Sequence, residues 1–138
     1  MAAQVHDKLD KTDANLNLAG LRVLIVEDEP LIAMFLEQAL TDIGCATVGV
    51  ANSLDEAAEK SAELTYDFVT LDVHLAGQQT FKFAKLLSQQ LTPFIFCTGY
   101  GNIIAPPQLQ HVPLLQKPFT ELELRDKITL ALTLKNQN

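Results

Sequence analysis

An apolar run followed directly by three acids and a proline stands out in the sequence: Arg22-Val23-Leu24-Ile25-Val26-Glu27-Asp28-Glu29-Pro30. Its apolar part has no polar alternation, which is typical of a strand buried on both faces of a parallel sheet. Pro30 suits the first turn of a helix, where its missing N–H would be unpaired in any case. The three carboxylates between strand and helix repel one another, so either water or a cation has to stabilise them.

Strand and helix patterns alternate outward from this stretch. We expect strands at 22–26, 46–50, 68–71, 93–97 and 112–116. We expect helices at 30–43, 54–64, around Phe83, and from 120 to about 135, two of them opened by Ser-x-x-Glu or Thr-x-x-Glu capping boxes. Glycines and prolines in 99–110 leave only a short, frayed helix there. Five such units with short links predict an α/β fold with a doubly wound parallel sheet.

Composition narrows the class of protein. The chain has 138 residues and 48% apolar residues, which suits one domain with its own core. We divide it into a flexible leader at 1–20, a domain at 21–135 and a tail at 136–138. A net charge of −7 argues against binding to nucleic acid or to an anionic membrane. No apolar run is long enough to cross a bilayer, and the only cysteines, Cys45 and Cys97, indicate no disulfide framework.

Polar residues stand where the expected strands end. Glu27 and Asp28 follow the first strand, Asp72 the third, Thr98 the fourth and Lys117 the fifth. The carboxyl ends of parallel strands share one edge of the sheet, where ligands bind. We therefore expect three carboxylates, one hydroxyl and one ammonium group to meet at that edge.

These residue types suit phosphoryl transfer assisted by Mg²⁺. Carboxylate oxygens are the hard ligands that Mg²⁺ prefers. Asp72 can act as the nucleophile toward phosphorus, while Lys117 pairs with the phosphoryl group and Thr98 donates a hydrogen bond to it. In the alternative interpretation the acids only cap the first helix and pair with the lysine. That alternative leaves Asp72 and Thr98 unexplained.

The five residues, in this order, resemble the site of bacterial response-regulator receiver domains. The resemblance covers about 21–135 and implies a five-stranded (βα)5, CheY-like fold with strand order 2-1-3-4-5. It also implies that a sensor histidine kinase phosphorylates Asp72, with Mg²⁺ bound by Asp28, Asp72 and the backbone carbonyl of His74, and Glu27 as the other acid of the pair. The His74 side chain lies where receivers tune hydrolysis of the acyl phosphate.

The segment Pro93–Gly101 is similar to the signature of the FAT GUY receivers, with Cys97 where alanine is usual. Typical receivers carry an aromatic residue three positions before the lysine, and Leu114 stands there in this chain. Tyr100 is the candidate substitute, and the alternative is a loop tyrosine that packs on the surface.

The glycines beside this tyrosine let the backbone move at low cost. We therefore expect phosphorylation to draw Thr98 inward and to reorder Gly99, Tyr100 and Gly101.

We expect a stand-alone cytoplasmic receiver, monomeric and not an enzyme in the usual sense. Its partners would be a histidine kinase or a phosphotransfer protein, and its output a changed protein-binding surface, with an apolar loop at 103–107 on that side.

Three alternatives stay open. A small aspartate-nucleophile phosphatase would need a second acid where His74 stands. A constitutive adaptor would not use Asp72. A flavin-binding protein of similar fold would need a phosphate-binding loop after the first strand, and that stretch is not rich in Ser, Thr or Gly.

Overall fold

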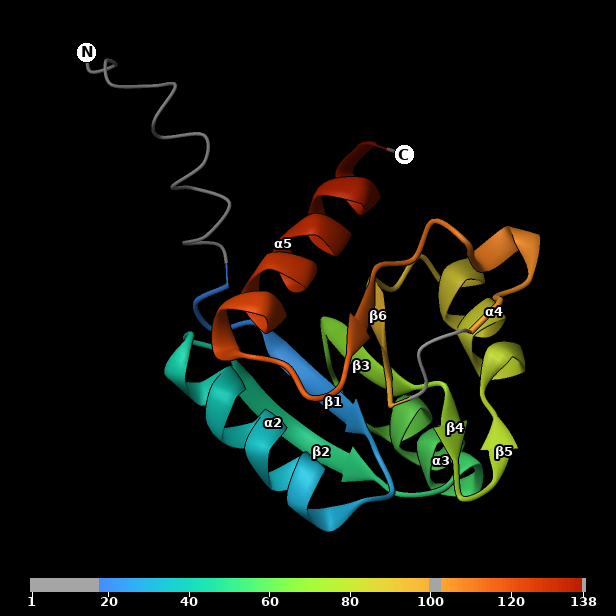
Figure 1. The fold of residues 1–138 in the computed structure, drawn as a ribbon, viewed down its shortest axis with the longest axis horizontal. Helices are drawn as coiled ribbons and strands as arrows, with labels where there is room; N and C mark the ends of the chain where they lie inside the picture. Colours follow the sequence, from blue (N-terminus) through green and yellow to red (C-terminus); the bar gives the residue numbers. More distant parts are fainter. Residues whose placement is uncertain (1–17, 100–102, 138) are drawn as a thin grey trace.

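The computed structural model describes residues 18–99 and 103–137. Its centre is a five-stranded parallel sheet with strand order β2-β1-β3-β6-β7, drawn in Figure 1. The strands are β1 (Arg22–Val26), β2 (Ala46–Ala51), β3 (Phe68–Asp72), β6 (Phe94–Thr98) and β7 (Leu114–Gln116). The order equals 2-1-3-4-5 for the main strands, so the expected doubly wound α/β fold is confirmed.

Helices cover both faces of the sheet. The helical elements are α2 (Pro30–Asp42), α3 (Leu54–Glu63), α4 (Phe81–Gln89), α5 (Glu121–Gln137) and the short 3-10 helix η1 (Pro107–Leu109). Helices α2 and α5 lie on one face, and α3 and α4 on the other (Figure 1). In β1, alternate residues pack into the two core clusters, Val23 and Ile25 into one, Leu24 and Val26 into the other. The expectation of a strand buried on both faces is therefore confirmed.

Of the two predicted capping boxes, the one at α5 forms completely and the one at α3 forms in part. At α5, the Glu123 amide donates to Thr120 Oγ1 at 3.1 Å, and the Thr120 amide donates to Glu123 Oε1 at 2.8 Å. At α3, Ser53 Oγ accepts from the Glu56 amide at 3.1 Å, but Glu56 in turn accepts from Asn52 rather than from Ser53. These bonds satisfy amides that have no partner within the helix.

The other strands begin and end within one residue of the expected positions, but the last strand starts two residues later than we expect. β7 begins at Leu114, not at Val112, because the Val112 amide turns back to the Leu109 carbonyl and Pro113 has no amide hydrogen to donate. Between 103 and 113 the only helical element is the turn η1, in agreement with a short helix.

A hairpin follows Asp72 that we did not expect. Strands β4 (His74–Leu75) and β5 (Gln78–Gln79) pair in antiparallel fashion. Ala76 and Gly77 between them have φ angles of 49° and 83°. Positive φ at both central residues is the requirement of a tight two-residue hairpin turn, usually met by Asn-Gly or Gly-Gly rather than by alanine.

Leu18 and Gly20 precede the domain start that we expect at 21, and both contact the folded domain. Leu18 is fully buried against α2 and α5, and the Gly20 amide donates to the Gly44 carbonyl at 2.8 Å. Residues 1–17 of the expected leader lie outside the described residues. None of the helices described here has the length and apolar character needed to cross a membrane.

Candidate functional site

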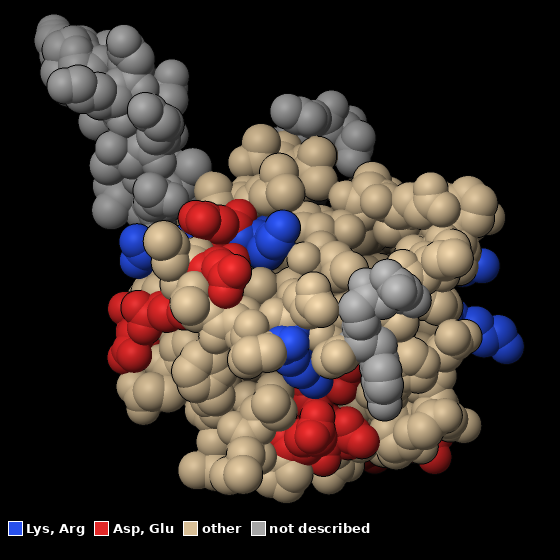
Figure 2. All heavy atoms as spheres, in the orientation of Figure 1, with Lys and Arg blue, Asp and Glu red and all other residues tan. Residues whose placement is uncertain are grey.

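The strand ends gather at one edge of the sheet, beneath a cleft of about 630 Å³. The cleft is lined by Asp28, Glu29, Asp72, His74, Gly77, Gly99 and Lys117. In Figure 2 acidic atoms cluster at the lower centre of the face shown, directly below basic ones, in the region where the strands of Figure 1 end. The sequence prediction that these strand ends meet is borne out by this geometry.

Three carboxylates form the negative side of the site. Glu27, Asp28 and Asp72 each offer an oxygen, and these oxygens lie within 4.8 Å of one another. Glu27 and Asp72 are only 1% and 6% exposed. Acidic oxygens this close and this buried repel one another strongly unless positive charge is nearby. The donor set therefore fits a hard divalent cation such as Mg²⁺, with room in the cleft for the waters that this ion keeps.

Lys117 supplies the positive charge on the other side. Its Nζ lies 2.7 Å from Glu27 Oε1 and 3.1 Å from Asp72 Oδ2, with Glu29 Oε1 at 3.7 Å. Its backbone amide donates to the Thr98 carbonyl at 2.7 Å, which fixes the start of the side chain beside β6. One ammonium group thus bridges the ends of β1 and β3 from the end of β7.

Burial and charge have opposite effects on the pKa values of Glu27 and Lys117. Burial raises the pKa of Glu27 to about 7, while the hydrogen bond from Lys117 opposes the rise and the charge of Asp72 adds to it. For Lys117, burial lowers the pKa, but the hydrogen bond with Glu27 and the charges of Asp72 and Glu27 outweigh it and leave the pKa above its ordinary value. The lysine therefore carries a full charge, and a cation beside Glu27 would favour the carboxylate form.

The remaining predicted residues fall on the same edge. Thr98 is buried at the end of β6, one residue beyond Cys97, which pairs in register with Asp72. Gly99 lines the cleft. His74 opens the hairpin, and its amide donates to Asp72 Oδ1 at 3.3 Å. Tyr100 lies outside the described residues.

Sequence reasoning missed three contacts. Glu29 was part of the acidic run but had no assigned role, and it pairs with Lys117 at the cleft wall. The Ala76 amide donates to Asp28 Oδ2 at 2.9 Å, and the Thr80 hydroxyl donates to the Asp72 carbonyl at 2.6 Å. The last two depend on the unexpected hairpin, so no pattern in the sequence could have located them.

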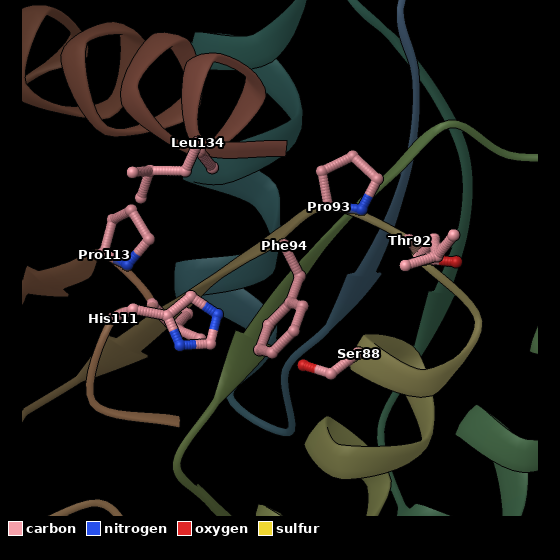
Figure 3. A pocket seen from close by; sticks show the side chains of 10 residues that line it. Ser88, Thr92, Pro93, Phe94, His111, Pro113 and Leu134 are labelled. Carbon is pink, nitrogen blue, oxygen red and sulfur yellow. The ribbon is translucent and has the colours of Figure 1, made fainter. Parts of the chain in front are cut away.

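The opposite edge of the sheet has a different character. A cavity of about 370 Å³ opens there, and Figure 3 shows Phe94, His111, Pro113 and Leu134 around it. Its lining is mostly apolar and contains one titratable side chain, His111. It offers no cluster of groups comparable with the acids and lysine at the carboxyl edge.

Comparison with known proteins gives a consistent result. Residues 23–129 match the family model described as the response regulator receiver domain. The phyllosphere-induced regulator PhyR of Methylorubrum extorquens is 31% identical over 135 residues, which are 94% of this chain and 51% of that protein. The transcriptional activator protein IrlR of Burkholderia pseudomallei is 32% identical over 108 residues, 75% of this chain and 47% of that protein. The chain thus spans about half the length of these curated relatives.

Solved structures are similar over most of the fold. The solution structure of SdrG from Sphingomonas melonis Fr1 has a TM-score of 0.74 and 33% identity, and the match covers 82% of this chain and 97% of that one. The receiver domain of Erythrobacter litoralis PhyR has a TM-score of 0.71 and 33% identity, over 87% of this chain and 95% of that one. Brucella abortus PhyR matches with a TM-score of 0.75 and 28% identity, over 98% of this chain and 57% of that one.

Proposed function

This chain belongs to the response regulator receiver domain family, and from that premise we propose that it accepts a phosphoryl group on Asp72 and signals by a phosphorylation-dependent protein–protein interaction. A receiver domain is a signalling module rather than a conventional enzyme, and receiver domains interact with histidine kinases. The donor proposed here is therefore a sensor histidine kinase, or a phosphotransfer protein that carries the same phosphohistidine.

One observation carries this proposal above all: a single ammonium group lies within hydrogen-bond distance of two buried carboxylates that stand at the ends of different strands. Burying such charges is expensive, so a purely structural role is a poor explanation for them. Perturbed and buried ionisable groups collect at functional sites. The acid cluster, the lysine and the open cleft above them meet what phosphoryl transfer requires, which is positioning and charge neutralisation.

Asp72, Lys117 and Thr98 have different roles in the proposed phosphoryl transfer. A carboxylate oxygen of Asp72 forms the new P–O bond while the P–N bond to the donor histidine breaks, and the bonding pair stays on the imidazole, which takes up a proton. Lys117 exchanges part of its contact with Asp72 for the arriving phosphoryl oxygens, and Thr98 donates a hydrogen bond to them.

Bound Mg²⁺ would neutralise charge on the phosphoryl oxygens. Glu27, Asp28 and Asp72 are the side chains that would hold it. The backbone carbonyl of His74 is the further ligand that the family resemblance implies.

The finer assignment is also a proposal. We place the chain among the FAT GUY receivers on the Pro93–Gly101 segment, as a stand-alone, monomeric receiver of the bacterial cytoplasm. Leu114 occupies the position of the usual switch aromatic and is 37% exposed. The switch would therefore consist of Thr98, Gly99 and Tyr100.

Labelling with a phosphodonor tests the function. The protein is incubated with Mg²⁺ and acetyl phosphate or a phosphorylated kinase, and its mass is measured. We expect one phosphoryl group on the wild-type protein and none on Asp72→Asn. Asp126→Asn, which removes an exposed carboxylate from α5, is the matched control and should be labelled like the wild type. Equal labelling of Asp72→Asn would disprove the acceptor.

A further inference from the structure

Thr80 closes the segment that begins at Asp72. Its hydroxyl donates to the Asp72 carbonyl at 2.6 Å, with the Val73 carbonyl at 3.2 Å, and its amide donates to the Val73 carbonyl at 3.0 Å. Thr80 is fully buried. The hairpin β4–β5 lies between these two ends, so Thr80 ties the far end of the hairpin to the end of strand β3.

The hydroxyl of Thr80 bonds to the end of strand β3 and does not cap helix α4. Thr80 is the residue before α4, and at that position a threonine side chain usually accepts from an amide in the first turn of the helix. No such bond is present at α4. A distance of 2.6 Å is short for an O–H···O hydrogen bond, and a buried carbonyl without this partner would be costly.

The segment held by Thr80 contacts two of the three carboxylates, Asp72 and Asp28. It begins with Asp72 itself, and the His74 amide donates to the Asp72 carboxylate. The hairpin turn then reaches across the cleft, where the Ala76 amide donates to Asp28 Oδ2. If the end of the hairpin moved, the orientation of both carboxylates would change with it.

We propose that Thr80 is a positioning residue of the phosphoryl-transfer site: its buried hydroxyl and amide fix the segment from Asp72 to Ala76 and so orient Asp72 and Asp28 toward the cation. This inference rests on the function proposed above. Partners of this kind, which hold the residues that bind a metal, commonly matter almost as much as the ligands.

Strand β3, which ends at Asp72, offers a matched control. Thr70 lies two residues before Asp72 on β3 and is 1% exposed, but its hydroxyl has no hydrogen-bond partner among the residues that the structure describes. Thr80→Val and Thr70→Val therefore make the same chemical change in equally buried places. Only the first removes a bond to the acceptor's backbone. Thr80→Ser restores the hydroxyl without the methyl group.

The experiment measures Mg²⁺ affinity for the four proteins by calorimetry, at a temperature where thermal melts show each to be folded. We expect Thr80→Val to weaken Mg²⁺ binding about tenfold, and Thr80→Ser and Thr70→Val to stay close to wild type. A lower melting temperature for Thr80→Val with an unchanged Mg²⁺ affinity would overturn the proposal, because it would mark a role in stability alone.

A second measurement covers the case in which Thr80→Val does not fold. In the wild-type protein, a Mg²⁺ titration followed by NMR should shift the amide resonances of Val73 and Thr80 more than that of Thr70. Equal or absent shifts at Val73 and Thr80 would overturn the proposal. Failure of the wild type to bind Mg²⁺ or to become labelled at Asp72 would instead overturn the proposed function, so the two failures are distinguishable.

Discussion

The two edges of the central sheet are built from the same five strands, yet they differ in the kind of side chain they bury. At the carboxyl edge, Glu27, Asp72 and Thr98 are buried beside Lys117. At the amino edge, the ends of β6 and β7 border an apolar cavity. Apolar burial stabilises the fold directly, whereas buried charges do so only when they are fully paired. We infer that the side chains of the carboxyl edge serve the reaction, whereas those of the amino edge stabilise the fold.

The largest expected effect on stability comes from removing the positive charge of Lys117 at the carboxyl edge. Lys117→Met leaves Glu27 and Asp72 buried without their partner, and we expect it to lower the free energy of unfolding by about 3 kcal/mol at pH 8. Urea titration measures the loss. Lys85→Met, at an exposed position on α4, is the control and should change stability by less than about 0.5 kcal/mol.

The loss should also depend on pH. Burial already raises the pKa of Glu27 to about 7, above its value of 4.5 in the unfolded chain, and removal of Lys117 raises it further. Both folded proteins bind more protons than the unfolded chain and lose stability as pH rises above about 4.5. The wild type stops losing stability near pH 7, whereas the variant goes on to higher pH, so the loss caused by Lys117→Met should be larger at pH 8 than at pH 5. A loss of the same size at pH 5 and pH 8 would show that packing, not charge, is what Lys117 contributes.

The next test breaks the packing of the amino edge. Phe94→Ala removes a ring that is 5% exposed and that meets Phe96 edge-on at a centroid distance of 5.5 Å. We expect the free energy of unfolding to fall by about 3 kcal/mol, near the low end for such a change because a cavity already lies beside the ring. Stabilisation of the folded variant by Mg²⁺ should be unchanged. A weakened response to Mg²⁺ would mean that the two edges are coupled.

The contrast also explains what could be predicted from the sequence. An apolar run followed by acids, as in Val23–Asp28, identifies a buried strand and its polar end, and parallel pairing then brings the ends together. The hairpin after Asp72 was missed because its turn uses an alanine at φ 49°, a conformation that the sequence does not indicate. Because the hairpin was not predicted, the sequence did not identify Thr80 as a contact of Asp72. Local periodicity therefore predicts which residues meet, but not which backbone segment orients them.

A smaller effect is expected from Mg²⁺ binding, which tests the cation site without disrupting the fold. At a Mg²⁺ concentration ten times its dissociation constant, the wild-type protein should gain about 1.4 kcal/mol of stability, because the ion binds only the folded chain. Asp28→Asn keeps an acceptor for the Ala76 amide but loses the charge, and we expect most of the gain to disappear. Asp126→Asn should keep it. Thermal melts with and without Mg²⁺ measure both, and an undiminished gain in Asp28→Asn would place the cation elsewhere.

We expect the smallest effect from the substitution Glu29→Gln. Like Asp28→Asn, it removes one negative charge from the carboxyl edge. Glu29 is 64% exposed, and its oxygen lies 3.7 Å from Lys117. Solvent screens such a pair, so Glu29→Gln should change the free energy of unfolding by less than about 0.5 kcal/mol and should leave most of the gain from Mg²⁺. The same melts compare it directly with Asp28→Asn. If both variants lost the gain equally, the number of charges at the edge would matter and their burial would not, because the two substitutions differ in position but not in charge.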